Sequence, residues 1–108
     1  MSDVETKFLA KIHFHFDSNS REKFVFGPNL MRAVPVKFDF VDGLNSLRIF
    51  VDQESEFLKG SIAEFMCDVV SENLIEQISI GSKGQLWDSS YFAGVEILEK
   101  VSANTNLD

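Results

Sequence analysis

The amino-acid sequence predicts an all-β domain, a small closed barrel of about six antiparallel strands. Three features of the stretch from Lys59 to Leu98 lead to this fold class. A turn at Gly60 opens the stretch, apolar residues then recur at every second position up to Val69, and a tight hairpin around Asp88 closes it. A turn, an alternating strand and a closing hairpin are the parts that a small antiparallel barrel requires.

The length of 108 residues is that of one domain, which can bury a core without disulfides or a metal. We expect a single barrel domain over residues 6–101. Flexible tails are expected at residues 1–5 and 102–108, because both ends are polar and poor in core residues. The sequence shows neither a basic and apolar leader nor an apolar run of membrane-spanning length. We therefore expect a cytoplasmic protein without a membrane partner.

Four strands are expected in the first half of the chain. Residues 8–17 alternate apolar and polar side chains throughout, which is typical of a half-buried strand, and residues 24–26 form a short second strand. A third strand covers residues 32–40, and Pro35 within it lacks an amide hydrogen, so this strand should begin at a sheet edge or a bend. Residues 47–51 form the fourth strand after a polar turn.

Residues 61–80 fit two alternatives. Ser61 followed by Glu64 has the spacing of a capping box, and apolar residues recur near helical spacing, which slightly favours a helix. The strand alternative places Ala63, Phe65 and Val69 on one face at alternate positions. The pattern of residues 71–80 is compatible with helix, strand or loop.

Short motifs along the chain follow one another in an order known from a protein family. In sequence order they are the strand Lys7–Phe14, the turn Ser20-Arg21, the aromatic strand and turn Phe24–Gly27, the segment Arg32–Phe38, the turn Leu58–Ser61 and the hairpin Leu86–Ile97. In this order and spacing, residues 7–101 resemble the C-terminal β-barrel domain, domain 3, of elongation factor Tu and related translational GTPases. The resemblance implies a closed, six-stranded Greek-key barrel and favours the strand over the helix for residues 62–70.

The resemblance also implies contacts with transfer RNA, a GTPase domain and an exchange factor, but this chain departs from the family where RNA is contacted. The glycine-rich arginine turn is Asn19-Ser20-Arg21, and Val41-Asp42-Gly43 replaces a polar Arg-Thr-Thr segment. The loop of the closing hairpin is shortened to Asp88-Ser89-Ser90 and carries no basic residue. We interpret these departures as a barrel that is kept while its RNA contacts are lost.

The predicted core consists of the inward-facing apolar residues of these strands. They are Ile12, Phe14, Phe16, Phe38, Phe40, Ile49, Phe65, Cys67 and Val69. Cys67 is the only cysteine, so the fold does not depend on an internal disulfide, and its apolar neighbours predict a buried, inert thiol.

The formal net charge is −7 and it is unevenly distributed. Seven basic and six acidic residues lie up to Arg48, whereas three basic and eleven acidic residues follow it. A surface of this sign repels phosphate backbones, so we expect no nucleic-acid binding. A basic partner protein is the better match, and acidity that only maintains solubility is the plainer alternative.

Few residues have the chemistry of a catalytic or metal site. His13, His15 and Asp17 share one strand face, but residues two apart in a strand are about 7 Å apart, so two imidazoles would need a ligand from a neighbouring strand. Solvated histidines on an outer face are the plainer interpretation. Residues 81–84 have the glycines of a phosphate loop without its spacing or its following helix. We expect no enzyme, no cofactor and no metal.

Trp87 and Tyr91 flank the turn of the closing hairpin and are placed to face each other across it. Such a pair often only stabilises a hairpin, but an exposed aromatic pair beside Asp88 is also a plausible anchor for a partner. Trp87, Asp88 and Tyr91 are therefore the candidate partner-binding residues. The sequence predicts a stand-alone, non-enzymatic interaction module for a basic protein. The alternative is a residual translation role, in contact with transfer RNA or a GTPase domain in trans.

Overall fold

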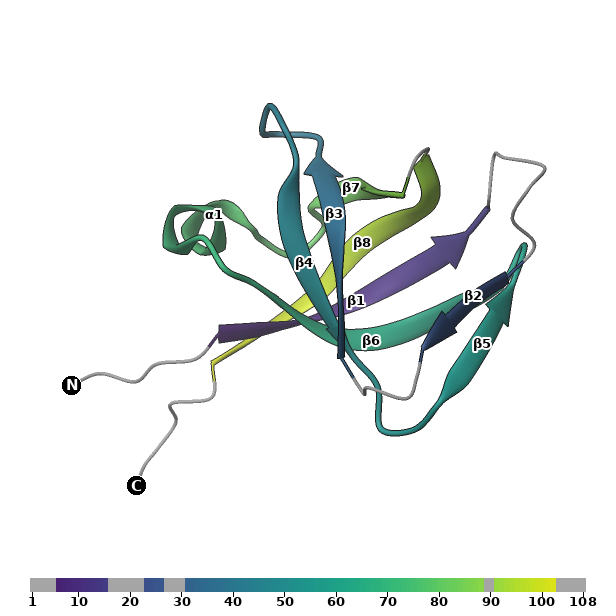
Figure 1. Cartoon of the computed structure of the whole chain (residues 1–108). Coiled ribbons are helices and arrows are strands. Elements are labelled where there is room, and N and C mark those ends of the chain that lie inside the picture. Colours follow the sequence, from purple (N-terminus) through teal and green to yellow (C-terminus); the bar gives the residue numbers. More distant parts are fainter. Residues whose placement is uncertain (1–5, 16–22, 27–30, 89–90, 103–108) are drawn as a thin grey trace, which may run out of the picture.

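A closed antiparallel barrel of six strands forms the body of the protein (Figure 1), as the sequence predicts. The computed structural model describes residues 6–15, 23–26, 31–88 and 91–102. Around the barrel the strand order is β1-β6-β4-β3-β7-β8, and β8 pairs with β1 to close it. The bounds are β1 (Thr6–Phe14), β3 (Met31–Phe38), β4 (Asn45–Phe50), β6 (Ile62–Val69), β7 (Lys83–Trp87) and β8 (Tyr91–Ser102).

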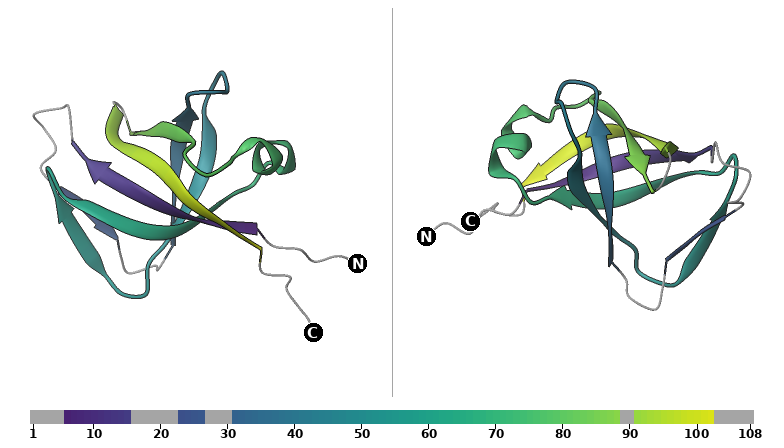
Figure 2. Two further views of the ribbon diagram at one scale, coloured as in Figure 1. Left: turned by 180° about the vertical axis from the view of Figure 1, so that it is seen from behind. Right: turned by 45° about the horizontal axis from the view of Figure 1, so that its top comes forward.

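Two further strands form a separate antiparallel ribbon outside the barrel. The ribbon pairs β2 (Lys23–Phe26) with β5 (Ser55–Leu58). It lies at one side of the barrel, and the short helix α1 (Glu72–Gln77) lies at the opposite side (Figures 1 and 2). The sequence predicts β2 as a strand. It does not predict β5, because Glu54 just before this strand and Glu56 within it are typical of ordinary surface charge beside a turn.

Phenylalanine rings fill the end of the barrel that the ribbon covers. Phe14 stacks on Phe57 with ring centroids 5.2 Å apart, and Phe57 meets Phe65 edge to face, also at 5.2 Å. On the other side of this cluster, Phe24 stacks on Phe92 at 4.9 Å. Aromatic pairs of this kind contribute about 0.5–1.5 kcal/mol each beyond their buried area. The ribbon is therefore attached to the barrel by its aromatic side chains rather than by strand pairing.

The predicted core is buried at the positions that the structure describes, with one exception. Buried as predicted are Ile12, Phe14, Phe38, Ile49, Phe65, Cys67 and Val69. Phe16 lies outside the described residues, as do the predicted tails apart from Ser102, where β8 ends.

The prediction that Phe40 belongs to the core is wrong. Phe40 is 41% exposed, because β3 ends at Phe38 and the chain turns at residues 39–40. The Phe40 ring stacks on the buried ring of Phe38 at 5.3 Å but stays partly exposed itself. In this turn Lys37 donates hydrogen bonds to the carbonyl oxygens of Phe38 and Val41 at 2.9 and 2.6 Å. The alternation of apolar residues thus continues two positions beyond the strand that it predicts.

Residues 62–69 form strand β6, so the helical alternative is wrong for them. The helix begins ten residues after the expected capping box, where the Ser71 hydroxyl accepts a hydrogen bond from the Leu74 amide at 3.3 Å. The one buried side chain of α1 is that of Leu74, and Ile78 after the helix is also buried. This short helix therefore covers the end of the barrel distant from the ribbon.

Two local features of the barrel follow directly from residue type. Gly60 has φ +88° in the turn before β6, where the Ser61 amide donates to the Leu58 carbonyl at 2.9 Å, so the predicted turn is present. At Gly84 a Cβ atom would lie 2.7 Å from the carbonyl oxygen of Lys37, so glycine permits the close approach of β7 to β3. Only residues 36–38 of β3 pair with β7, so Pro35 lies in the part of β3 that pairs with β4 alone. This position agrees with the expected sheet edge.

Candidate functional site

The hairpin of β7 and β8 presents the aromatic pair predicted from the sequence. Trp87 and Tyr91 are register partners across the hairpin, and a bulge between Leu86 and Trp87 interrupts the regular pairing before them. The two aromatic residues are 36% and 39% exposed, respectively. Asp88 follows Trp87, and residues 89–90 of the turn lie outside the described residues. The hairpin tip therefore offers two partly exposed rings to the solvent.

Arg32 supplies a positive charge to this tip, which the sequence pattern does not predict. Its guanidinium lies 4.0 Å from the Asp88 carboxylate and donates a hydrogen bond to the Val25 carbonyl at 3.0 Å. The guanidinium carbon also lies 4.4 Å from the centroid of the Phe24 ring, a cation–π distance. Because Asp88 has a basic neighbour, the hairpin tip is close to neutral and provides little attraction for a basic partner.

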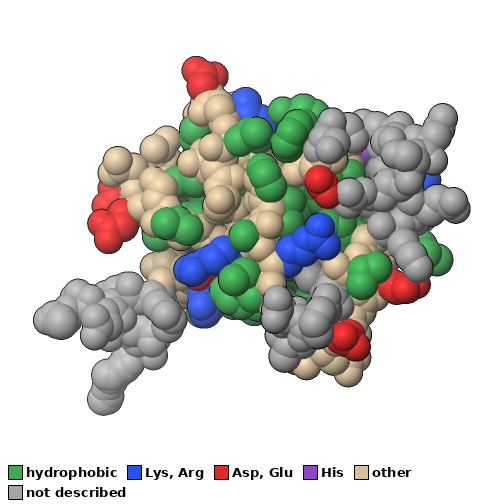
Figure 3. All heavy atoms as spheres, in the orientation of Figure 1, with side chains coloured by type: hydrophobic (Ala, Val, Ile, Leu, Met, Phe, Trp, Pro, Cys, Tyr) green, Lys and Arg blue, Asp and Glu red, His purple; other side chains and the backbone are tan. Residues whose placement is uncertain are grey.

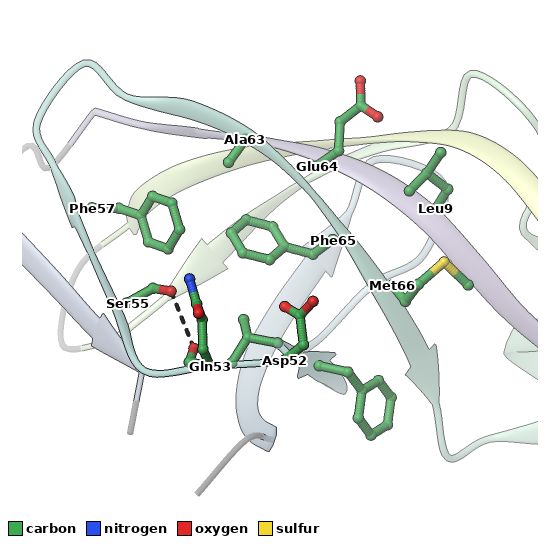
Figure 4. A pocket seen from close by; sticks show the side chains of 11 residues that line it. Leu9, Asp52, Gln53, Ser55, Phe57, Ala63, Glu64, Phe65 and Met66 are labelled. Atoms are coloured by element: carbon green, nitrogen blue, oxygen red, sulfur yellow. Dashed lines mark hydrogen bonds between the residues drawn. The ribbon is translucent and has the colours of Figure 1, made fainter. Parts of the chain in front are cut away.

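A second surface opens between the ribbon and the barrel wall, and we call it the β5–β6 cleft (Figure 4). Its volume is about 550 Å³. Residues from β1, β4, β5, β6 and the segment before β5 line it: Leu9, Phe50, Val51, Asp52, Gln53, Ser55, Phe57, Ala63, Glu64, Phe65 and Met66. The volume falls in the range of sites that hold small molecules or single side chains of a partner.

The cleft exists because β4 and β6 separate. These strands pair from Leu47 with Val69 up to Phe50 with Met66, and their described pairing ends there. The chain then passes through residues 51–54 into β5, which pairs with β2 of the ribbon instead of continuing along β6. The space that a longer β4 would fill is left open beside the first half of β6.

Apolar side chains form the floor of the cleft. Phe57 and Phe65 lie side by side in Figure 4, and their edge-to-face contact connects the floor with the barrel core. Phe65 is 6% exposed, whereas Phe57 is only half buried. On the other side of β6, Leu9 and Met66 add two half-buried apolar side chains. A small apolar side chain of a partner would thus find both aromatic and aliphatic contacts.

Carboxylates stand at the rim of the cleft. Asp52 and Glu64 are exposed, and neither has an ion pair among the described residues. Lys11, opposite Glu64 on β1, pairs with Glu96 at 3.5 Å instead. None of the described residues that line the cleft is a lysine or an arginine. The combination of an apolar floor with an acidic rim matches a cationic, partly apolar ligand.

Other carboxylates of the protein are neutralised within the fold. Asp68 is 7% exposed and accepts two hydrogen bonds from Arg48, at 2.6 and 2.8 Å, while the Lys7 ammonium lies 3.7 Å away. On the face of the molecule drawn in Figure 3, basic side chains lie among apolar ones toward the middle and most acidic ones lie nearer the outline. Part of the acidity seen in the sequence is therefore cancelled inside the fold, at Asp68.

His13 and His15 lie beside a polar groove of about 440 Å³ on the outer face of β1, β7 and β8. Their ring centroids are 6.4 Å apart and the rings meet edge to face. Lys11, Asp39, Lys83 and Glu96 also line this groove. Asp17 lies outside the described residues, and within the described ones no three His, Cys, Asp or Glu side chains form a group that could hold a metal ion.

The Cys67 thiol lies inside the barrel. Burial, with a smaller contribution from the negative charge of Asp68, raises the pKa of Cys67 from its ordinary value of 9.0 to about 12. Its thiol is fully buried and lies 3.7 Å from the Phe65 carbonyl oxygen. Near neutral pH the group is therefore a protonated, apolar side chain, which is unsuited to nucleophilic chemistry.

Comparisons with known proteins gave no match for this chain. No protein-family model matches it, and searches of curated proteins and of solved structures gave no significant similarity. The described helix α1 has six residues, and within the described part of the chain no helix is long and apolar enough to cross a membrane.

The sequence and the structure point to two different candidate surfaces. The structure brings Trp87 and Tyr91 together as predicted, and it adds Arg32 to the site. The β5–β6 cleft is not predicted. One signal for it is present in the sequence, because Asp52, Glu54 and Glu56 occupy alternate positions before and within β5, the spacing of a strand face.

Proposed function

We propose that the protein is a non-enzymatic interaction module that holds a basic partner protein in the β5–β6 cleft. The observation that carries this proposal is the combination, at one opening, of an apolar floor with carboxylates that lack a described counter-ion. Neither feature alone would identify a ligand. Together they specify a partner with a cationic group next to an apolar one.

The two features contribute in different ways to binding. An apolar side chain that enters the cleft and contacts Phe57 and Phe65 gains about 1.5–3 kcal/mol from burial. The carboxylates of Asp52 and Glu64 mainly accelerate association and orient a basic partner, and their effect weakens as salt screens it. A partner must bury further surface around the cleft, because a stable interface covers roughly 1,200–2,000 Å².

The Trp87–Tyr91 pair is a second contact surface in this proposal. It lies near β2 of the ribbon, since Arg32 links Asp88 to the Val25 carbonyl. A partner that extends from the cleft over the ribbon would reach it. Because the tip is close to neutral, it would contribute apolar contact rather than attraction.

We also propose that the chain is related to domain 3 of elongation factor Tu. This proposal includes the Greek-key connectivity of that domain and a cytoplasmic location. The ordered turns and the closed six-stranded barrel support it. A translation role in contact with transfer RNA is the weaker alternative, because the chain carries a net charge of −7 and the shortened hairpin loop lacks a basic residue.

The test is affinity capture on the immobilised protein, followed by identification of the bound proteins. The informative variant is Asp52→Asn with Glu64→Gln, which removes two charges at the cleft. Its matched control is Glu72→Gln with Glu76→Gln, which removes two exposed charges on α1, at the opposite side of the barrel.

We expect a basic protein to be retained by the wild type and by the α1 control, and to be lost from the cleft variant. Equal retention by both variants would place the partner elsewhere on the surface. Capture of only ribosomes, transfer RNA or a translational GTPase would favour the translation role and overturn the proposal.

A further inference from the structure

The first half of β6 has a strand neighbour on one side only. On that side β1 pairs with β6 from Ile62 to Cys67. On the other side β4 pairs with β6 only from Met66 to Val69, and no other described strand pairs with residues 62–65. This stretch of β6 is therefore an edge that faces the β5–β6 cleft.

The backbone groups on this edge can be assigned from the alternation of an antiparallel ladder. The Phe14 amide donates to the Ser61 carbonyl at 2.9 Å, which makes this pair a hydrogen-bonded one. In the register of β1 with β6, hydrogen-bonded pairs then recur at Ala63 and Phe65. The amide and carbonyl groups of Ile62 and Glu64 consequently point away from β1, to the side on which the cleft opens, where Glu64 lines the cleft and Ile62 precedes its lining residue Ala63.

The lining of the cleft shows that it opens on this edge. Ala63 and Phe65 project from the inner face of β6, and Glu64 and Met66 project from its outer face, as the opposite directions of Phe65 and Glu64 in Figure 4 show. A cavity on one face of a strand would touch only every second residue. A cavity that touches four successive residues must surround the strand edge.

From these observations we infer that the cleft takes an extended, basic segment of the partner, which adds as a strand to the Ile62–Phe65 edge of β6. The inference rests on the proposed function and specifies its ligand. A helix, about 10 Å across with its own backbone groups bonded internally, could not bond to the Ile62 and Glu64 backbone. An extended segment would form hydrogen bonds with these backbone groups and occupy the position beside β6 that β4 leaves open.

The two faces of the edge also predict the side-chain pattern of the segment. Alternate side chains of the added strand would point to the inner face, toward Phe57 and Phe65, and to the outer face, toward Glu64. Apolar residues alternating with lysine or arginine satisfy both faces. A second copy of this chain is a poor occupant, because pairing two copies of this edge would bring the Glu64 carboxylates together.

The first test uses a short synthetic peptide in which lysine alternates with valine around one central phenylalanine, titrated into the whole protein at moderate salt. The control peptide has the same composition, with lysines in one block and apolar residues in another. We expect only the alternating peptide to bind and to slow hydrogen exchange of the Ile62 and Glu64 amides. Binding without slower exchange at either amide overturns the inference and leaves the proposed function standing.

The second test changes the edge itself. Ile62→Pro removes an amide hydrogen on the free edge of β6, and Ile62→Ala removes the same exposed side chain but keeps that hydrogen. Proline is tolerated at the first residue of a strand, and Ile62 is 60% exposed, so both variants should fold. Loss of one backbone hydrogen bond should weaken binding about three- to tenfold relative to Ile62→Ala.

Each combination of results has a distinct meaning. Equal affinities of Ile62→Pro and Ile62→Ala for the alternating peptide exclude strand addition. If neither peptide binds but a basic partner still depends on Asp52 and Glu64 for capture, the inference is wrong and the proposed function is retained. If neither peptide binds and no basic partner depends on the cleft, both are wrong.

Discussion

The hairpin tip and the β5–β6 cleft both place exposed apolar groups next to a carboxylate, yet they differ in charge. At the tip, Asp88 lies 4.0 Å from Arg32, whereas Asp52 and Glu64 at the cleft have no ion pair among the described residues. The sequence draws attention to the first surface and the structure to the second. The comparison shows that a count of acidic residues does not locate negative potential, since a counter-ion from a distant strand can cancel it.

The two surfaces should differ most in how far their aromatic side chains support the fold. Phe65 in the floor of the cleft is 6% exposed and contacts the rings of Phe14 and Phe57, while Trp87 at the tip is 36% exposed. Phe65→Ala should lower the free energy of unfolding by about 3–5 kcal/mol. Trp87→Ala should cost about 1 kcal/mol or less, as for a partly exposed hairpin pair. Urea denaturation of both variants checks this, and similar losses would contradict the distinction.

Paired and unpaired carboxylates offer a second comparison. Asp68→Asn keeps the shape of a 7% exposed side chain but weakens its two hydrogen bonds with Arg48, so it should destabilise the protein by about 1–3 kcal/mol. Asp52→Asn removes an exposed charge without a described partner and should change stability by no more than about 0.5 kcal/mol. Thermal unfolding at low and high salt measures both. A larger cost for Asp52→Asn would show that it has a structural partner.

The raised pKa of Cys67 should make the stability of the protein depend on pH. This pKa is about 12 in the folded state, against an ordinary value of 9.0 that applies in the unfolded chain. Between these values the unfolded state binds fewer protons than the folded state, so stability should fall as pH rises, by at most about 1.4 kcal/mol per pH unit. Denaturation of wild type and Cys67→Ala between pH 8 and pH 11 tests this, because the variant should lack this part of the slope. Identical slopes would mean that the thiol is more accessible than its burial indicates.

The smallest expected effect concerns partner binding at the hairpin tip. If the tip contributes apolar contact to a partner held mainly in the cleft, Trp87→Ala with Tyr91→Ala should weaken binding less than Asp52→Asn with Glu64→Gln does. A loss of roughly threefold to tenfold is expected at the tip, as for contacts outside the central anchor of an interface. Affinities of the purified partner for both double variants measure this. A larger loss at the tip would reverse the order of the two surfaces.

The sequence predicts the barrel well because the signal for it is local. Alternation at Ile12 and Phe14 and the turn at Gly60 each involve residues a few positions apart, and the structure confirms them. The same logic fails at Phe40, where alternation continues past the end of β3. The helical spacing and the capping box would place a helix after Ser61, but Ser71 is the N-cap, and the strand that the family resemblance favours for residues 62–70 is present as β6. Both errors arise because a local sequence pattern continues past the residues that take part in the strand or the helix.

The fold class, the burial of Cys67 and the pairing of Trp87 with Tyr91 follow from the amino-acid sequence alone, because period-two patterns and tight turns act between near neighbours. The places where carboxylates are neutralised and where a strand edge is open depend instead on contacts between distant segments. The ion pair of Arg32 with Asp88 joins strands distant in sequence, and the cleft depends on β5 pairing with β2 instead of β4 continuing along β6. Such pairings are selected by the packing of the whole barrel and its ribbon, which no short segment encodes.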